Sequence, residues 1–456
     1  MLTSLAPDAK DGKGFMDFVR RFFRLQAHGV TVRSELAAGA ATFAAMAYIL
    51  AVNPEILSHA GMDRSAVLAA TALASALFTA AMGLYANLPV ALAPGMGMNA
   101  YFAFGLCVAG GLKWEQALGI VFWSGALFLV VALSGLRKAV LDAVPAPLRA
   151  AIACGVGAFI AFIGLQKAGL VVAAPATLVG LGNLAAPGPL LALGGLLLAV
   201  VLMRARVPGA VLWTVVAVTA LGLVVRGPDG RPLTAWPREW LAAPPNPGRI
   251  AGELDLLYPL KHFGQCVPWL FTVFFIDLFD GMGTLLGLIR RLERKAPAAD
   301  PRFERALRAD ACATMGCALL GTSTVTPYIE SAAGIESGGR TGLAALATAG
   351  CFLLALLAAP LFLAVPAVAT APVLILVGVL MMEGIGQIDF ADLGDAVPAL
   401  LIVLLMPLTF SIAEGIAVGF LAYVVLRAAI GRAREIPAAL WGITVLLVLH
   451  FAWRMA

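Results

Sequence analysis

The chain has 456 residues, of which 61% are hydrophobic and only 12% carry a formal charge. An ordinary soluble domain is about 25% charged, so this composition excludes a soluble globular protein. The net charge of +5 is spread over short segments between apolar runs. That distribution argues against a nucleic-acid-binding surface and is typical of a membrane topology signal.

Apolar runs follow one another along the whole chain. A bilayer-spanning helix takes about 20 residues, and the first half of the chain carries seven runs of roughly this size, at 34–53, 66–86, 88–108, 114–135, 148–168, 189–204 and 207–225. A polar stretch rich in proline and glycine, 226–264, separates them from seven more, at 265–290, 306–321, 322–339, 341–358, 360–382, 398–411 and 413–430. We therefore expect an all-α polytopic membrane protein with 14 transmembrane segments. The C-terminal segment 431–456 adds one further apolar stretch, 437–453, which we assign to a surface or terminal helix.

Lysine and arginine in short loops predict the orientation of these segments. Basic residues gather in the N-terminal arm 1–33, the Arg137/Lys138/Arg149 loop, the Arg204/Arg206 loop and the stretch 290–308. An even number of predicted segments separates each of these sites from the next, so all four can lie in the cytoplasm. We expect a multi-pass protein of the inner or plasma membrane with a cytoplasmic N-terminus, and the loop 226–264 on the extracellular or periplasmic side.

Two sets of seven segments in opposite orientations predict an inverted repeat, here 34–225 and 265–430. Val144-Pro145-Ala146 opens the fifth segment and Val365-Pro366-Ala367 lies in the twelfth, with Gly157 and Gly378 at matched distances. The third and tenth segments also share a layout, in which an extended run reaches a proline and a small-residue helix follows.

Neither the third nor the tenth segment reads as an uninterrupted helix. Because proline suits the first position of a helix, we expect breaks at Pro94, Gly95 and Pro327, with a short strand before each break and a half-helix after it. Two ordinary kinked helices are the alternative.

Few ionisable groups lie deep in apolar segments, where each is costly and is by default a functional candidate. Asp277 and Asp280 lie in the eighth segment and share a helical face with Thr284. Glu330 follows Pro327 by three positions, and Asn99 follows Pro94 by five. A buried structural hydrogen bond is the alternative role for these polar groups.

Other kinds of chemistry find little support in the sequence. There is no GxxxxGK[ST] loop for nucleotide phosphates and no HExxH zinc motif. The four histidines lie outside the central segments. We expect no enzyme activity, no metal and no cofactor. A channel is compatible with paired half-helices, but no selectivity-filter signature is present.

Four runs of the sequence resemble a known family. They are Thr42–Asp63, Ala93–Phe102 (APGMGMNAYF), Phe279–Leu285 (FDGMGTL) and Gly321–Leu343 (GTSTVTPYIESAAGIESGGRTGL). They are similar to the adenine/guanine/hypoxanthine permeases, the AzgA-like branch of the nucleobase-ascorbate transporters. The resemblance implies 14 segments as two inverted sevens, with a core domain (34–135 and 265–358), a gate domain (148–225 and 360–430) and a homodimer in the lipid bilayer. It further implies symport of protons with adenine, guanine or hypoxanthine by alternating access.

The resemblance also implies site residues. Asp280 and Glu330 match the family's acidic positions, Tyr328 lies beside the second, and Asn99 matches a polar position of the third segment. With Thr284 these form the expected substrate site, and the rings of Tyr328, Phe102 or Phe279 could stack on a base. Gly281-Met282 and Pro327 depart from the family's usual residues, which bears on base preference.

Asp280 and Glu330 are both expected to take part in proton coupling, but in unequal roles. Glu330 lies in the first turn of a half-helix and should accept hydrogen bonds from the N–H groups of the purine. Asp280 lies within a continuous apolar span and should exchange the coupling proton. Two alternatives share the architecture. One is a sulfate-type anion carrier, which should have a cationic or neutral centre, and the other is a permease for xanthine or uracil.

Overall fold

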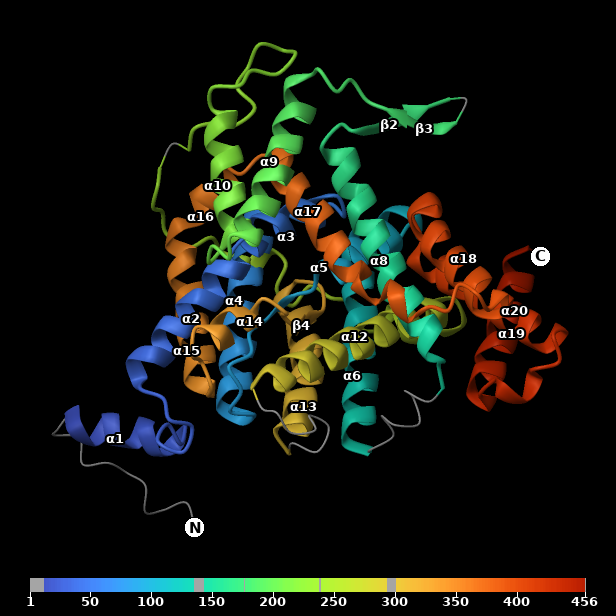
Figure 1. The fold of residues 1–456 in the computed structure, drawn as a ribbon, viewed down its shortest axis with the longest axis horizontal. Coiled ribbons are helices and arrows are strands. Elements are labelled where there is room, and N and C mark those ends of the chain that lie inside the picture. Colours follow the sequence, from blue (N-terminus) through green and yellow to red (C-terminus); the bar gives the residue numbers. More distant parts are fainter. Residues whose placement is uncertain (1–11, 135–142, 176, 238, 293–300, 456) are drawn as a thin grey trace.

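The structure, a computed structural model, describes residues 12–134, 143–175, 177–237, 239–292 and 301–455. Helices dominate it, and two small two-stranded sheets are the exceptions (Figure 1). Over these ranges nine helices or helix pairs are long and apolar enough to cross a membrane. They are α2–α3 (Val32–Met46, Ile49–Ser58), α4 (Arg64–Tyr85), α6 (Trp114–Ser134), α8 (Ala146–Lys167), α9 (Pro187–Arg204), α12 (Phe263–Leu292), α15–α16 (Gly342–Ala355, Ala359–Leu363), α17 (Ala367–Met381, with a 3-10 turn to Gln387) and α19 (Ile412–Ala429).

The remaining apolar runs are also helical but shorter or more polar. They form α10 (Ala210–Gly222), α13 (Pro301–Leu320), α18 (Leu393–Thr409) and α20 (Ala438–Met455). Helix α13 is more polar than a lipid-exposed span, since it carries three arginines, a glutamate and an aspartate. It packs against α6 and α4 inside the bundle. The chain is therefore a helical, multi-pass membrane protein.

Polar residues at helix starts explain several boundaries. The hydroxyl of Thr31 accepts the backbone N–H of Ser34 at the start of α2, and the carboxylate of Asp63 accepts the N–H of Ala66 at the start of α4. The Ser65 hydroxyl and that N–H hold the pKa of Asp63 below its usual range. Such caps satisfy backbone donors that a helix leaves free in its first turn.

The predicted start of the twelfth segment is wrong. The twelfth segment was expected to begin at residue 360, but α15 continues through a short turn into α16, and α17 begins only at Ala367. Pro366 immediately precedes α17 in an extended conformation, which suits a residue whose ring favours the start of a helix. Pro145 occupies the same position before α8.

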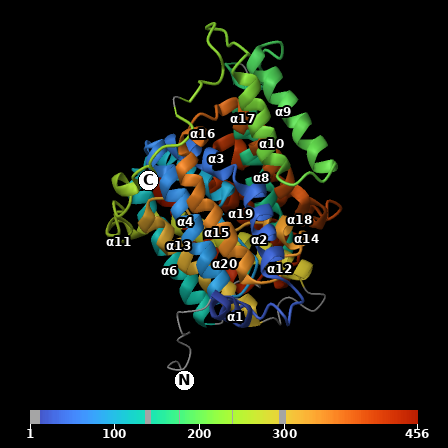
Figure 2. The same ribbon diagram turned by 90° about the vertical axis from the view of Figure 1, so that its left-hand side faces the viewer.

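The polar connections gather at opposite ends of the bundle. Helix α1 (Gly12–Phe22) lies across one end, and the unpredicted hairpin of β2 (Val171–Ala174) and β3 (Leu178–Leu181) projects from the other (Figure 1). The 226–257 loop starts at the hairpin's end and runs down the side of the bundle to the short helix α11 (Tyr258–Lys261), with a 3-10 turn at Pro247–Arg249 (Figure 2). The loop with Arg137 and Lys138 falls outside the described residues.

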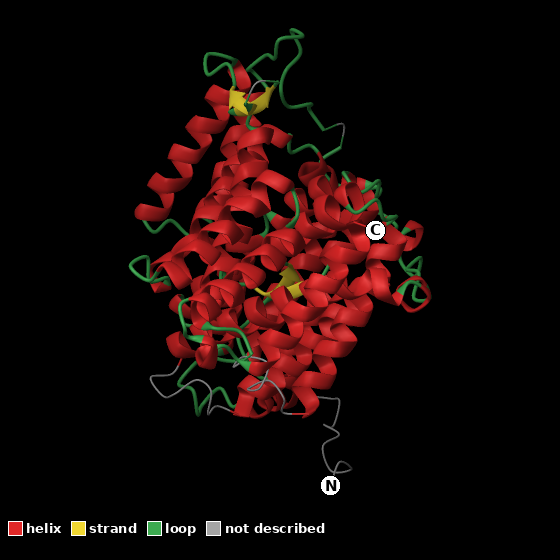
Figure 3. Cartoon of the chain, turned by 90° about the vertical axis from the view of Figure 1, so that its right-hand side faces the viewer, coloured by secondary structure: helices red, strands yellow, loops and turns green. Residues whose placement is uncertain are grey.

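The third and tenth segments have the expected strand and half-helix. Strand β1 (Leu92–Pro94) pairs antiparallel with β4 (Val325–Pro327) in the middle of the helices, where Figure 3 shows it in yellow. Helix α5 (Met96–Ala100) follows β1 and continues as a π-helix, Tyr101–Ala109, and α14 (Ser331–Glu336) follows β4.

The exact breaks differ from the prediction. Pro94 and Pro327 end the strands rather than begin the helices, because they pair with Val325 and Leu92 in the β1–β4 ladder. Gly95 precedes α5 as its N-cap, and Glu330 precedes α14, one residue before its first turn.

Helices α8 and α17 make the most extensive helix pair of the structure. They cross at Gly157 and Gly378, where each glycine faces the backbone carbonyl of the other and neither position has room for a Cβ atom. Small residues of this kind let membrane helices approach closely. The two glycines found at matched distances in the sequence thus face each other in the fold.

Candidate functional site

A cavity of about 320 Å³ lies between α12, the first half of α8 and the end of α17. Its polar lining consists of Asp280 and Thr284 from α12, Arg149 from α8, and Gln387 after α17. The Arg149 guanidinium lies 5.8 Å from the centre of the Phe279 ring, which also lines the cavity. A volume of this size falls at the lower end of small-molecule sites, which run from about 300 to 1,000 Å³.

The structure divides the predicted polar face of α12. Asp280 and Thr284 line the cavity as a pair. Asp277 instead accepts a hydrogen bond from the hydroxyl of Thr314 on α13, at 2.8 Å. Asp277 shares a helical face with Asp280 and Thr284 but does not line the cavity, because α13 covers that face one turn before Asp280.

The β1–β4 ladder lies beside this cavity. Gly97, in the first turn of α5, has no room for a Cβ because Val156 of the cavity wall lies against it. The hydroxyl of Tyr328 donates to the carbonyl of Pro94 at 2.7 Å, and the backbone N–H of Tyr328 donates to Ala91 at 2.9 Å. The third and tenth segments therefore approach each other as predicted, and Tyr328 links them.

Glu330 is tied to the first segment. The hydroxyl of Tyr48 donates to Oε1 of Glu330 at 2.6 Å. Tyr48 lies at the junction of α2 and α3, where the first span breaks. A carboxylate that accepts so short a bond is held in one orientation. Glu330 is not among the residues that line the cavity.

Asn99 also bridges the two broken segments. Its side-chain oxygen accepts a hydrogen bond from the hydroxyl of Ser323, just before β4, and its amide nitrogen lies 3.4 Å from the carbonyl of Pro94. Asn99 is fully buried. Its contacts are thus with the protein on both sides of the ladder.

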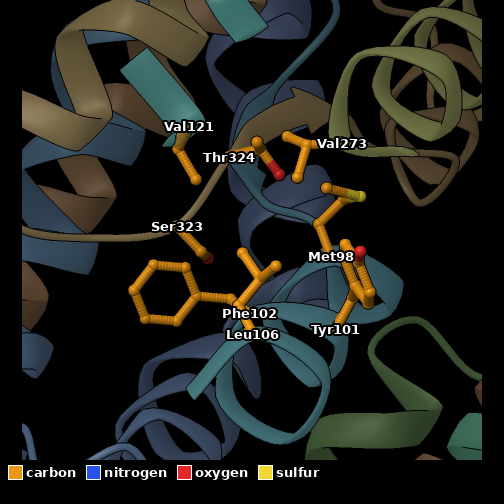
Figure 4. Close-up of a pocket in the computed structure, with 8 residues that line it drawn as sticks. All are labelled: Met98, Tyr101, Phe102, Leu106, Val121, Val273, Ser323 and Thr324. Atoms are coloured by element: carbon orange, nitrogen blue, oxygen red, sulfur yellow. The ribbon is translucent and has the colours of Figure 1, made fainter. Parts of the chain in front are cut away.

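Phe102 lies in a different place from Asp280. It lines a narrow pocket with Met98, Tyr101, Ser323 and Thr324, which Figure 4 shows from close by. This pocket has no room for a water molecule. In this conformation Phe102 packs beside the ladder, and Phe279 is the phenylalanine that reaches the larger cavity.

Tyr48, Gln387 and Asp310 were missed as candidates, and Arg149 was read only as a topology signal. Their sequence surroundings are ordinary, and nothing local links Tyr48 to Glu330 across 282 positions. Asp310 carries a signal that could have found it, since it is a carboxylate within a predicted membrane segment.

A partly buried ion pair lies at the opposite end of α8 from the cavity. Glu55 of α3 accepts from Lys167, the last residue of α8, at 3.3 Å, and from Arg64 at the start of α4 at 2.8 Å. Burial and the neighbouring Lys167 lower the pKa of His59, which keeps that ring neutral beside the two cations at pH 7. The pair joins α3 to α8, while the cavity separates α12 from the first turns of α8.

A cavity between helices, next to two broken segments in the middle of a multi-pass bundle, is the arrangement found in secondary transporters. A family model described as the Permease family matches residues 33–418. The chain belongs to the Permease family.

Two curated relatives match over almost their full lengths. The adenine permease AdeP of Escherichia coli is 39% identical over 97% of this chain and 97% of its own. The guanine/hypoxanthine permease PbuO of Bacillus subtilis is 40% identical over 91% of this chain and 96% of its own. These matches confirm the resemblance to adenine and guanine/hypoxanthine permeases.

Among solved structures, the transmembrane domain of the cyanobacterial bicarbonate transporter BicA has a similar fold. It superposes with a TM-score of 0.62 and 17% sequence identity, covering 84% of this chain and 96% of that domain. At this identity the likeness establishes the transporter fold alone.

Proposed function

We propose that this chain is a secondary active transporter that takes up purine nucleobases together with protons. The cavity that Asp280 lines carries the proposal, because it places a carboxyl group, a hydroxyl, an amide and a guanidinium around one space. The names of the relatives, which are adenine and guanine/hypoxanthine permeases, support a purine as the substrate.

The lining suits a purine in its chemistry. A purine base has ring N–H donors on one edge and nitrogen or oxygen acceptors on the others. The Asp280 carboxylate can accept from an N–H, and the side chains of Thr284 and Gln387 can donate to acceptors. Phe279 offers an aromatic face for the ring. Glu330 and Asn99, at the neighbouring ladder, are proposed to complete the site when the helices move.

We also propose the 14-segment arrangement as two inverted sevens. Two pairs of equivalent elements support it, since β1 pairs with β4 and α8 crosses α17. Each pair would lie on a shared two-fold axis. The proposed core domain is 34–135 with 265–358, and the proposed gate domain is 148–225 with 360–430. The close packing of α8 with α17 and α18, and of α4 with α13 and α15, supports this division.

The sidedness follows the loop charges. We propose that the end of the bundle with α1 is cytoplasmic and that the 226–257 loop and the β2–β3 hairpin are outside, in an inner or plasma membrane. The first turns of α8 and the end of α17 would then line a cavity on the cytoplasmic half. A homodimer is proposed on the resemblance alone.

In an alternating-access cycle, the Glu55–Lys167 ion pair would hold the external side of the protein closed. Lys167→Met should favour the outward-open state, because the pair joins the proposed core and gate domains. Loss of a partly buried pair costs about 1 kcal/mol, or about a fivefold shift between the two states. The measurement is labelling of Ala413→Cys by a membrane-impermeant maleimide in a cysteine-free background. Ala413 lines a small cavity between α12 and α19.

Arg64→Gln is the matched control for that variant. Arg64 contacts the same carboxylate, but it lies on α4, within the proposed core domain. Labelling that rises equally in both variants would assign the cluster to local stability instead of closure.

Uptake measurements test the proposed function directly. In cells that lack purine permeases, expression of the chain should give accumulation of labelled adenine or hypoxanthine. The accumulation should collapse with a protonophore and should not change when sodium is removed. Accumulation that requires sodium at constant pH would refute proton coupling. Uptake of sulfate or bicarbonate without purine uptake would favour the anion carrier.

A further inference from the structure

Two buried carboxyl groups lie where α12 packs against α13, one on each helix and outside the cavity lining. Asp277 and Asp310 are both fully buried. One carboxyl oxygen of Asp277 accepts a hydrogen bond from the Thr314 hydroxyl. The other oxygen has no hydrogen-bond partner in the described part of the chain. Neither oxygen of Asp310 has a partner among those residues.

The two helices contact each other at two neighbouring pairs of residues. Asp277 meets Thr314, and one turn further along α12 Gly281 meets Asp310. A Cβ atom at Gly281 would overlap Oδ2 of Asp310 and would lie 3.7 Å from the ring of Pro327. Gly281 therefore leaves the space that the Asp310 carboxyl occupies. Because Asp277 precedes Gly281 by one helical turn, both carboxyl groups belong to one interface.

Neither carboxyl group is paired with a positive charge among the described residues. In the ranges that the structure describes, no ion pair involves Asp277 or Asp310. The titratable groups nearby are Asp280 on α12 and the thiol of Cys317 on α13, which donates to the Thr314 carbonyl. Helices α4 and α6 pack on α13, yet α4 has no charged residue after Arg64 and α6 has none after Glu115.

Two ionised carboxylates cannot share such a site. Each buried charge without a partner costs several kcal/mol, and like charges add to that cost. A protonated carboxyl is neutral and gains a hydrogen-bond donor, which can serve the oxygens that lack a partner. The site is thus built to hold a proton.

We propose that Asp277 and Asp310 form a second proton-binding site, separate from the substrate cavity. Asp280 connects the two places, since it lines the cavity and is the neighbour of Gly281 in the chain. The affinity of the Asp277–Asp310 pair for its proton changes when Asp280 ionises or when a purine occupies the cavity. This inference rests on proton-coupled transport as the proposed function.

Infrared difference spectroscopy of the purified protein tests the site without any gradient. The spectrum should contain the C=O band of a buried protonated carboxyl at neutral pH, and Asp310→Asn and Asp277→Asn should each remove it. Asp280→Asn should leave that band in place. Adenine or hypoxanthine should shift the band in the wild-type protein, while Asp310→Asn still binds the base.

Gly281→Ser keeps the test open if the asparagine variants do not fold. Its hydroxyl would lie against the Asp310 carboxyl, a side-chain end that can move, and should lower the frequency of the same band. An unchanged spectrum in Asp310→Asn, or a band that sodium removes, would overturn the proton site. Since the band is recorded without transport, its presence or absence is independent of whether uptake of purines is driven by protons.

Discussion

Asp280→Asn should abolish proton-driven accumulation of purine while leaving measurable binding. Asparagine keeps the shape of aspartate and can still accept a hydrogen bond, but it cannot take up or release a proton. Asp280 is the carboxyl group that lines the 320 Å³ cavity. In proteoliposomes, coupling to one proton concentrates substrate about tenfold for each pH unit, and the variant should bring this ratio to about one.

Exchange of labelled for unlabelled base across the membrane should persist in Asp280→Asn, because exchange needs binding without net proton movement. Thr284→Val is the matched control, since it lines the same cavity but does not titrate. It should weaken binding about fivefold, the loss of about 1 kcal/mol from one hydrogen bond, and should still concentrate the base. If Asp280→Asn accumulates purine under a pH gradient, another group carries the coupling proton.

Glu330→Gln should lose purine binding. A hydrogen bond to a charged group contributes about 1.5 to 3 kcal/mol, so replacing the carboxylate should weaken binding about 10- to 100-fold in calorimetry. Tyr48→Phe should weaken it as well, because the Tyr48 hydroxyl holds Oε1 of Glu330 at 2.6 Å. Tyr48→Phe leaves the charge of Glu330 in place and removes only the hydrogen bond that orients its carboxylate.

Glu336→Gln, at the last residue of α14, is the control. Glu336 is exposed and pairs with Arg291 at 2.7 Å, away from the ladder. It should bind purines as the wild type does. Normal binding by purified Glu330→Gln would contradict the role of Glu330 as the purine acceptor and would leave its bond to Tyr48 as a structural one.

The helices could be predicted from the sequence because the signal is local. The apolar runs became helices, except the third and tenth, where the prolines at 94 and 327 marked broken segments correctly. Pro366 shows the limit of such reading. The apolar run around it continues on both sides, and only the backbone restriction of proline decides where α17 begins.

The site could be predicted only in part, for a different reason. Asp280 and Thr284 lie one turn apart, so their shared face follows from helix geometry. Which neighbour covers each face does not follow, and that is why Asp277 turned out to face Thr314 on α13. Tyr48 and Arg149 reach the site through contacts between distant helices, which no local pattern encodes.

The ladder between β1 and β4 also sets the order in which the protein can be completed during synthesis. Tyr328 and Pro94, which meet there, are 234 positions apart in the chain. Strand β1 therefore enters the bilayer long before its partner exists, with backbone groups that lipid cannot satisfy. The centre of the molecule is finished only when the tenth segment leaves the ribosome, and until then the first half depends on provisional partners for that strand.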